Sequence, residues 1–129
     1  MIQIDDAGSG SLIGGTCIGA IRVETGEYFY DFIPLKYYRG YNFQSKRYLN
    51  KCCEIVLQLL KLLGTDKDEI IQICRGYMFD IARDQLINKG YNIESTKIDD
   101  PLQDRVENTF QEYALSMGLP KQYVEYTKY

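Results

Sequence analysis

The sequence predicts a mixed α/β domain that begins with an antiparallel meander of three strands and continues with alternating strands and helices. Three β-favouring segments, 2–5, 15–23 and 27–35, follow one another across turns that contain glycine. Segment 45–63 then repeats apolar residues at the spacing of one helix face. Beyond it, strand-like and helix-like segments alternate as far as residue 118, which is typical of an α/β domain.

Each strand of the meander has its own signal. Residues 2–5 alternate between apolar and polar, as in a strand with one covered face. Gly26 can adopt the positive φ that a short hairpin loop needs between the second and third segments. The third segment is rich in aromatic residues and ends at Pro34, which predicts a strand that stops there.

The helix predicted for segment 45–63 has signals at both ends. Ser45 is a suitable N-cap, and Gly64 stands where a helix commonly ends in a left-handed residue. Its wide apolar stripe indicates a helix that is covered over much of its circumference. The stripe contains Leu49, Cys52, Cys53, Val56, Leu59, Leu60 and Leu63.

The second half of the chain is predicted to alternate between strands and helices. A buried strand is expected at 69–74, a helix at 77–89 and a short strand at 91–98. Pro101 marks the first position of a last helix that ends near residue 118. The apolar face of that helix consists of Leu102, Val106, Phe110, Tyr113, Ala114 and Met117.

Length and composition predict one globular domain. The chain has 129 residues, of which 45% are hydrophobic and 26% charged, and its net charge is −3. We expect a single domain over 1–120, followed by a tyrosine-rich C-terminal tail, 121–129. The sequence has neither a run of about 18 apolar residues nor a charged and apolar leader, so we expect a cytoplasmic protein without a membrane partner.

Cysteine and histidine usage restricts the chemistry. Cys17, Cys52, Cys53 and Cys74 all lie within apolar patterns, so we expect buried, reduced thiols. The chain contains no histidine and no C-x-x-C pair, which leaves too few ligands for zinc and excludes histidine-based acid–base catalysis. Catalysis by this chain would depend on carboxylates, other side chains or a bound metal.

One segment, 32–53, contains no acidic residue, although the net charge of the chain is −3. Its basic residues are interleaved with aromatic ones, which suits contacts to phosphates together with stacking on bases. The alternative is a solvated loop and helix start whose tyrosines pack on the sheet. The basic residues are Lys36, Arg39, Lys46, Arg47 and Lys51, and the aromatic ones are Tyr37, Tyr38, Tyr41, Phe43 and Tyr48.

Asp5 and Asp6 end the first strand and precede a run of small residues, 7–11. Carboxylates beside a glycine-rich turn are suited to metal or phosphate chemistry. Because side chains alternate along a strand, we expect only one of the two to face a site. The alternative is that both acids simply form the turn.

The order of these elements, with an Asp at the end of the first strand, resembles the ribonuclease H-like superfamily, which includes ribonuclease H and the RuvC-type Holliday-junction resolvases. The local resemblance covers 4–23: the Asp-Asp pair, a small-residue turn, Gly14-Gly15 and the Gly-Ala-Ile-Arg of 19–22. The resemblance implies a three-stranded antiparallel meander extended by two parallel strands, with helices on both faces.

The same resemblance implies a catalytic site of carboxylates that hold Mg²⁺ or Mn²⁺. Asp6, or Asp5 if the register differs by one, corresponds to the carboxylate of the first strand. Glu54 corresponds to the glutamate of the first long helix, and Asp100 or Asp104 to the aspartate of the last helix. Asp6 and Asp100 are the expected metal ligands, because these ions prefer oxygen donors.

The chain departs from the family pattern at two places. Ribonuclease H has an Asp at the end of its fourth strand, where this chain has Cys74 and Arg75, and the nearest carboxylate is Asp80. Glu54 falls within the polar arc of its helix, so it could equally be a solvated charge that pairs with Lys51 or Lys61.

Three functions follow as hypotheses. The first is a metal-dependent nuclease or resolvase that acts on nucleic-acid phosphodiesters. The second is a non-catalytic module of the same fold that binds a protein or nucleic acid. The third is a phosphate- or nucleotide-binding module that uses Asp6, Gly8, Ser9 and Gly10. The expected partners are a nucleic acid and, as a homodimer, a second copy of the chain.

Overall fold

The structure is a computed structural model that describes residues 1–8 and 15–116. Its five strands form one open mixed sheet in the order β3-β2-β1-β4-β5, which confirms the predicted α/β class. The pairs β1–β2 and β2–β3 are antiparallel, whereas β1–β4 and β4–β5 are parallel. The strands are β1 (Ile2–Ala7), β2 (Thr16–Arg22), β3 (Tyr28–Ile33), β4 (Ile70–Cys74) and β5 (Asn92–Thr96).

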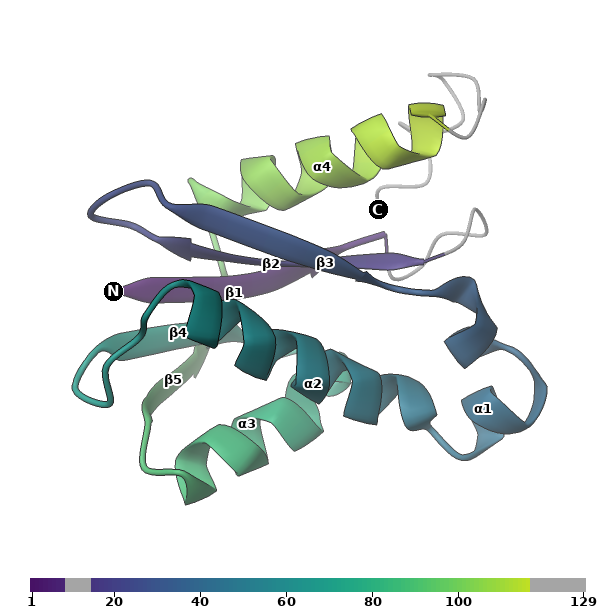
Figure 1. Cartoon of the computed structure of the whole chain (residues 1–129), viewed down its shortest axis with the longest axis horizontal. Helices are drawn as coiled ribbons and strands as arrows, with labels where there is room; N and C mark the ends of the chain where they lie inside the picture. Colours follow the sequence, from purple (N-terminus) through teal and green to yellow (C-terminus); the bar gives the residue numbers. More distant parts are fainter. Residues whose placement is uncertain (9–14, 117–129) are drawn as a thin grey trace.

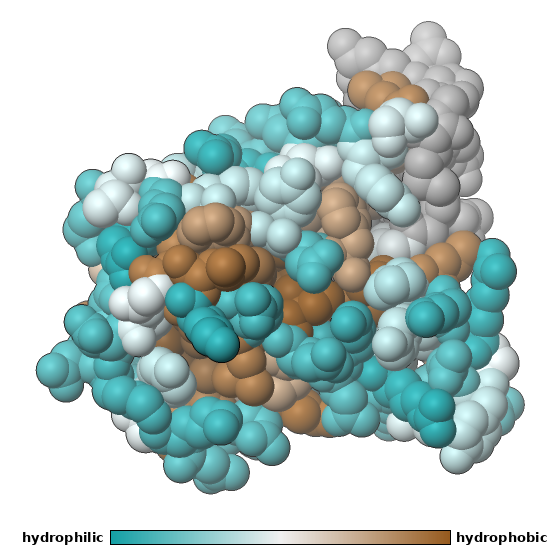
Figure 2. All heavy atoms as spheres, in the orientation of Figure 1, coloured by the Kyte–Doolittle hydropathy of each residue, from teal (hydrophilic) through white to brown (hydrophobic). Residues whose placement is uncertain are grey.

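Helices cover both faces of the sheet, as Figure 1 shows. Helix α4 (Leu102–Ser116) packs on one face, against β1 and β2, and α2 (Arg47–Leu62) and α3 (Asp80–Asn88) cover the other face. Two apolar cores result, one for each face. In the view of Figure 2, apolar side chains gather between β3 and α2, with hydrophilic side chains around them.

Helix α4 follows the predicted apolar face closely. Leu102, Val106, Phe110 and Ala114 recur every four residues and are all buried. Two small positions let this helix approach the sheet: a Cβ atom added at Gly19 would lie 2.2 Å from Val106, and one at Gly8 would lie 2.2 Å from Phe110. Met117, the tail 121–129 and the predicted boundary at residue 120 lie outside the described residues.

The start of α2 differs from the prediction. A short helix, α1 (Gly40–Gln44), precedes it, and the Ser45 hydroxyl donates a hydrogen bond to the Tyr41 carbonyl, 2.7 Å away. Ser45 therefore ends α1 instead of capping α2, so the predicted N-cap is wrong. A left-handed Lys46, with φ of 57°, turns the chain between the two helices, and α2 begins at Arg47.

The other end of α2 is as predicted. Gly64 has a φ of 64°, and the amide of Thr65 donates a hydrogen bond to the Leu60 carbonyl at 3.1 Å. This is the arrangement in which a left-handed glycine satisfies the last carbonyls of a helix.

Two 3₁₀ turns complete the fold. The first, η1 (Leu35–Tyr38), connects β3 to α1, and the second, η2 (Tyr77–Phe79), connects β4 to α3. The helix predicted for 77–89 therefore begins as η2 and continues as α3. Within the described residues, no helix has the length and apolar character needed to span a membrane.

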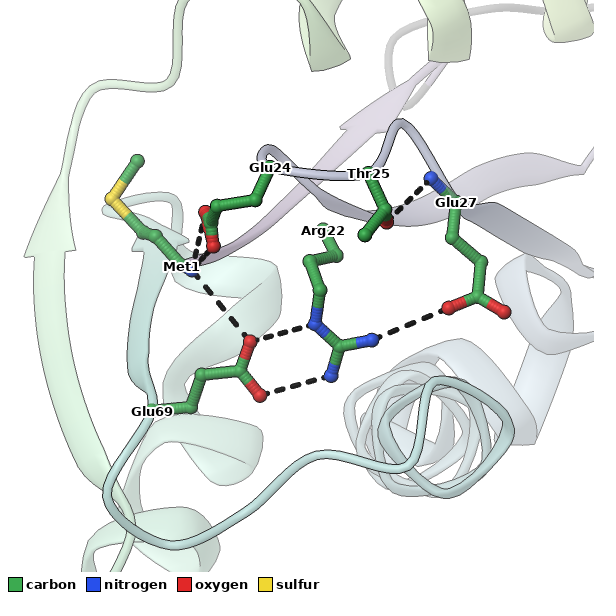
Figure 3. A network of polar contacts seen from close by, with 6 residues as sticks. All are labelled: Met1, Arg22, Glu24, Thr25, Glu27 and Glu69. Carbon is green, nitrogen blue, oxygen red and sulfur yellow. Dashed lines mark hydrogen bonds and ion pairs between the residues drawn. The ribbon is translucent and has the colours of Figure 1, made fainter.

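An ion-pair network holds the amino end of the sheet together (Figure 3). The Arg22 guanidinium donates from Nε and Nη2 to the two carboxylate oxygens of Glu69, at 2.8 and 2.9 Å. It also donates to Glu27 at 3.2 Å, and the amino group of Met1 contacts Glu24 and Glu69. The network thus joins β1, the β2–β3 hairpin and the segment before β4.

The cysteines are free thiols, as predicted. Cys17, Cys52 and Cys53 are buried, and Cys74 at the end of β4 is half-buried. Burial raises the pKa of each of these thiols, so all four stay protonated near neutral pH.

Candidate cation site and aromatic cleft

Two carboxylates and a thiol converge at the carboxyl ends of β1 and β4. One ligand atom each from Asp5, Asp6 and Cys74 lies within 4.8 Å of the others, and all three residues are half-buried. The parallel pairing of Ile4 with Ile73 makes this possible, because it sets the residues that follow in the two strands side by side. Among the described residues, these three form the group whose donors could hold a metal ion.

Asp5 and Asp6 leave the strand on opposite faces. Ile2 and Ile4 belong to the core beneath α2, so the alternation of β1 sends Asp6 to that face and Asp5 to the face of α4. The sequence predicted that only one of the two would face a site. Asp6 lines a cleft, and Asp5 lies beside Asp6 and contacts Cys74. Both carboxylates therefore contribute to the cluster.

The surroundings of Asp5 make its charge costly. Burial raises the pKa of the Asp5 carboxyl from its ordinary value to about 7, and the negative charge of Asp6 adds to the rise. Hydrogen bonds from the Asp6 amide and the Cys74 thiol partly oppose it. A divalent cation between two carboxylates would remove this repulsion, which is how such ions invert the local pKa.

The donor set favours a hard or borderline cation. Carboxylate oxygens are the preferred ligands of Mg²⁺ and suit Mn²⁺ equally. Burial raises the pKa of the Cys74 thiol to about 11, so this third donor is protonated near neutral pH. The residues present therefore fit Mg²⁺ or Mn²⁺ held by Asp5 and Asp6, with water completing the coordination.

Asp6 also lines a cleft of about 320 Å³, which we call the aromatic cleft. It lies at the carboxyl ends of the parallel strands, where ligands commonly bind in open α/β sheets. Its walls come from η1, α1 and α2 on one side and from the loop after β4 on the other. The lining residues are Asp6, Tyr38, Phe43, Tyr48, Gly76, Tyr77 and Met78.

The first wall of the aromatic cleft consists of three rings in contact. The Tyr48 ring stacks on Phe43, with centroids 5.7 Å apart, and contacts Tyr38 in a tilted arrangement, with centroids 5.2 Å apart. The Tyr38 hydroxyl and the buried Thr16 hydroxyl form a hydrogen bond of 2.7 Å. This bond ties the three rings to the start of β2 and so holds the wall in place.

The second wall is the loop between β4 and α3. Arg83 donates hydrogen bonds to the carbonyls of Cys74 and Gly76 and forms an ion pair with Asp80. Phe79, which is fully buried, anchors the loop from below. Asp80, the acid nearest to the end of β4 in the sequence, is thus engaged in holding this loop.

The predicted nucleic-acid-binding residues lie on η1, on α2 and in the turns on either side of α1, and four of the five are exposed. Lys46 lies at the aromatic cleft, with its Nζ 5.3 Å from the centre of the Tyr77 ring, and a hydrogen bond with Tyr77 raises its pKa. Lys36 and Arg47 lie over other tyrosine rings, and Arg39 is exposed. Lys51 forms an ion pair with Glu54 instead.

Glu54 is not part of the acid cluster. Its side chain is 73% exposed, and its Oε1 lies 3.6 Å from Lys51 Nζ. Both residues line a separate hollow of about 160 Å³ together with Asp31. The structure thus matches the alternative of a solvated charge paired with Lys51.

Asp100 and Asp104 lie at the start of α4, and both are exposed. Asp104 lies between the buried Leu102 and Val106 in the sequence but points away from the sheet, on the exposed side of the helix. The Asp100 carboxylate accepts a hydrogen bond from the Asp104 amide at 3.3 Å, as a helix cap does. The structure does not bring either acid to the cluster.

Sequence reasoning missed two parts of the site. It treated Cys74 as a departure from a family pattern, whereas the register of β4 against β1 sets that residue beside Asp5. It also overlooked Tyr77 and Met78, which follow β4 directly and therefore lie at the same edge. Ser9 and Gly10, which belong to the hypothesis of a phosphate-binding loop, lie outside the described residues.

Comparison of the chain with models of known protein families gives no match, and neither does comparison with curated proteins. The site is therefore interpreted from its own geometry and chemistry.

Proposed function

We propose that this chain is a divalent-cation-dependent nuclease with a ribonuclease H-like fold. The observation that carries the proposal is the convergence of Asp5, Asp6 and Cys74 within 4.8 Å, at the edge of a cleft lined by Asp6. The meander extended by two parallel strands supports the fold assignment, because the resemblance to ribonuclease H implies that arrangement. The aromatic and basic residues around the aromatic cleft support a nucleic-acid substrate.

Asp5 and Asp6 would hold Mg²⁺ or Mn²⁺, which when bound supplies a Lewis acid for a phosphodiester oxygen. Lys46 would attract the phosphate backbone toward the cleft. The rings of Tyr48 and Tyr77 would orient the nucleotide and exclude water from one side. Cys74, as a neutral thiol, would donate a hydrogen bond to Asp5 and so limit the rotation of that carboxylate.

The experiment is a thermal-shift titration with Mn²⁺ on the wild type, on Asp6→Asn and on the control Glu54→Gln. At a Mn²⁺ concentration of about 100 times Kd, binding stabilises the folded state by about 2.7 kcal/mol, or roughly 10 °C in Tm. We expect this shift in the wild type and in Glu54→Gln but not in Asp6→Asn. Equal shifts in all three proteins, or none in the wild type, would exclude the cation site.

Cleavage of labelled single- and double-stranded nucleic acids with Mn²⁺ completes the test. We expect cleavage by the wild type and by Glu54→Gln, and none by Asp6→Asn or by any of the proteins in EDTA. Cleavage that survives in Asp6→Asn would mean that the nuclease chemistry lies elsewhere.

A second candidate is a non-catalytic module that binds nucleic acid through the same surface. The outward ion pair of Glu54 with Lys51 favours it, because a two-metal nuclease needs a further carboxylate at the cluster. This module would bind nucleic acid in a salt-dependent manner while Mn²⁺ leaves its Tm unchanged.

A further inference from the structure

We infer that the aromatic cleft binds one unpaired nucleobase, so that the substrate is single-stranded or locally unpaired nucleic acid. This inference deepens the proposed function, since it names the substrate class of the same site. Its starting point is size. A cleft of about 320 Å³ falls at the small end of the range of ligand pockets, where it holds one nucleotide and not a duplex.

The walls of the cleft present aromatic faces. Phe43 and Tyr77 stand on the two sides, and each is 50% exposed although both are large hydrophobic residues. Every base has a π face, so aromatic walls of this kind stack bases without regard to their sequence. Enzymes that act on an extruded base likewise hold it between aromatic or apolar side chains.

The charges at the cleft select a nucleotide over an aromatic side chain of a protein. Lys46 stands at one side, 5.3 Å from the centre of the Tyr77 ring, and can contact a phosphate while the base stacks on that ring. Asp6 stands at the other side, where its cation would neutralise a second phosphate. An aromatic peptide side chain carries no phosphate for Lys46 to contact.

The backbone at Lys46 adds an independent indication. Lys46 is the one non-glycine residue with a positive φ among the described residues, at 57°. A residue with a Cβ atom disfavours this conformation, and such strain gathers at functional sites. Here it places the lysine at the turn between α1 and α2, with its side chain on Tyr77.

The walls are preformed, which reduces the ordering cost of binding. Tyr38 is held by Thr16, and the opposite loop is held by Arg83 and the buried Phe79. A base in a duplex can enter this cleft only when it leaves its own stack, so paired strands compete poorly for the cleft.

The experiment measures binding of a short single-stranded oligonucleotide that carries one 2-aminopurine, whose fluorescence falls when it stacks. The chain has no tryptophan, so the probe is excited without that background. A matched oligonucleotide with an abasic site and the fully paired duplex serve as competitors. All titrations are done in EDTA, where cleavage by a bound cation cannot occur.

We expect quenching on binding, and competition by the abasic strand and by the duplex that is roughly tenfold weaker than by the intact single strand. Tyr77→Ala and Phe43→Ala should remove this preference, and Tyr77→Phe should retain it. Tyr30→Ala is the matched control: Tyr30 is 51% exposed, lies on β3 and contacts the rings of Tyr28 and Phe32 outside the cleft. It should bind like the wild type.

Equal binding of the intact and abasic strands would overturn the inference, as would a base preference that both alanine variants retain. The outcome is separable from that of the nuclease proposal. Base-dependent binding in EDTA, in a protein that Mn²⁺ does not stabilise, would support the base site and remove the nuclease. Stabilisation by Mn²⁺ without base-dependent binding would support the cation site of the nuclease and remove the base site.

Discussion

The carboxylates at the two ends of the sheet lie in opposite electrostatic environments. At the amino end, Glu69 receives two hydrogen bonds from Arg22, and this guanidinium lowers the pKa of Glu69. At the carboxyl end, Asp5 is buried beside the like charge of Asp6, and its pKa is raised to about 7. One end is held together by its charges, whereas the other would gain stability from a cation.

This difference separates charges that support the fold from charges that suit a ligand. An Arg–carboxylate pair with two parallel hydrogen bonds stabilises the elements that it joins. A carboxylate whose charged form is disfavoured in the free protein costs stability, and such perturbed groups are concentrated at functional sites. Substitutions at the two ends should therefore change the stability of the protein in opposite directions.

The largest effect on stability is expected from Asp5→Asn. The pKa of Asp5 is raised to about 7 in the folded state. Below the unfolded-state pKa near 4 the carboxyl therefore does not lower the free energy of unfolding, and its destabilising effect grows until the pH passes about 7. Without divalent cations, the variant should be more stable than the wild type by about 2–4 kcal/mol at pH 8 and equally stable at pH 4. Urea unfolding at the two pH values measures this. A destabilised variant at pH 8 would contradict the assigned cost.

The next effect is expected from Arg22→Ala at the amino end. This change should destabilise the protein by about 1–2 kcal/mol at pH 7, because it removes a half-buried, doubly hydrogen-bonded ion pair. The pKa of Glu69 is lowered in the folded state, so the difference should shrink as the pH falls through that value. Arg22→Lys retains the positive charge but cannot donate the two parallel hydrogen bonds to Glu69, so it should recover part of the lost stability. An unchanged unfolding midpoint would mean that the network does not stabilise the sheet.

The smallest effect is expected from Glu54→Gln. Its ion pair with Lys51 is exposed, so the variant should lose less than about 0.5 kcal/mol, and the loss should vanish at high salt. Its Mn²⁺ affinity should equal that of the wild type. A lower affinity would show that Glu54 reaches the cation after all, and would restore the carboxylate set implied by ribonuclease H.

Local patterns were enough to predict most of the elements. The recurrence of Leu102, Val106, Phe110 and Ala114 predicted the buried face of α4, because residues four apart lie on the same face of a helix. Gly64 marked the end of α2 for the same local reason. Ser45 was misleading, because it stands between the end of α1 and the start of α2, and the sequence does not say which helix its hydroxyl serves.

The sequence by itself determined most of the elements, the two acids at the end of β1 and the aromatic and basic character of the segment that follows β3. Tertiary structure alone decided which of these side chains meet. The parallel pairing of β1 with β4 set Cys74 beside Asp5, whereas the outward position of Glu54 already followed as one alternative from its place in the polar arc of α2. The physical reason is the sequence separation of the interacting residues. Periodicity and helix caps involve residues a few positions apart, whereas the register between distant strands depends on which faces of the sheet are buried.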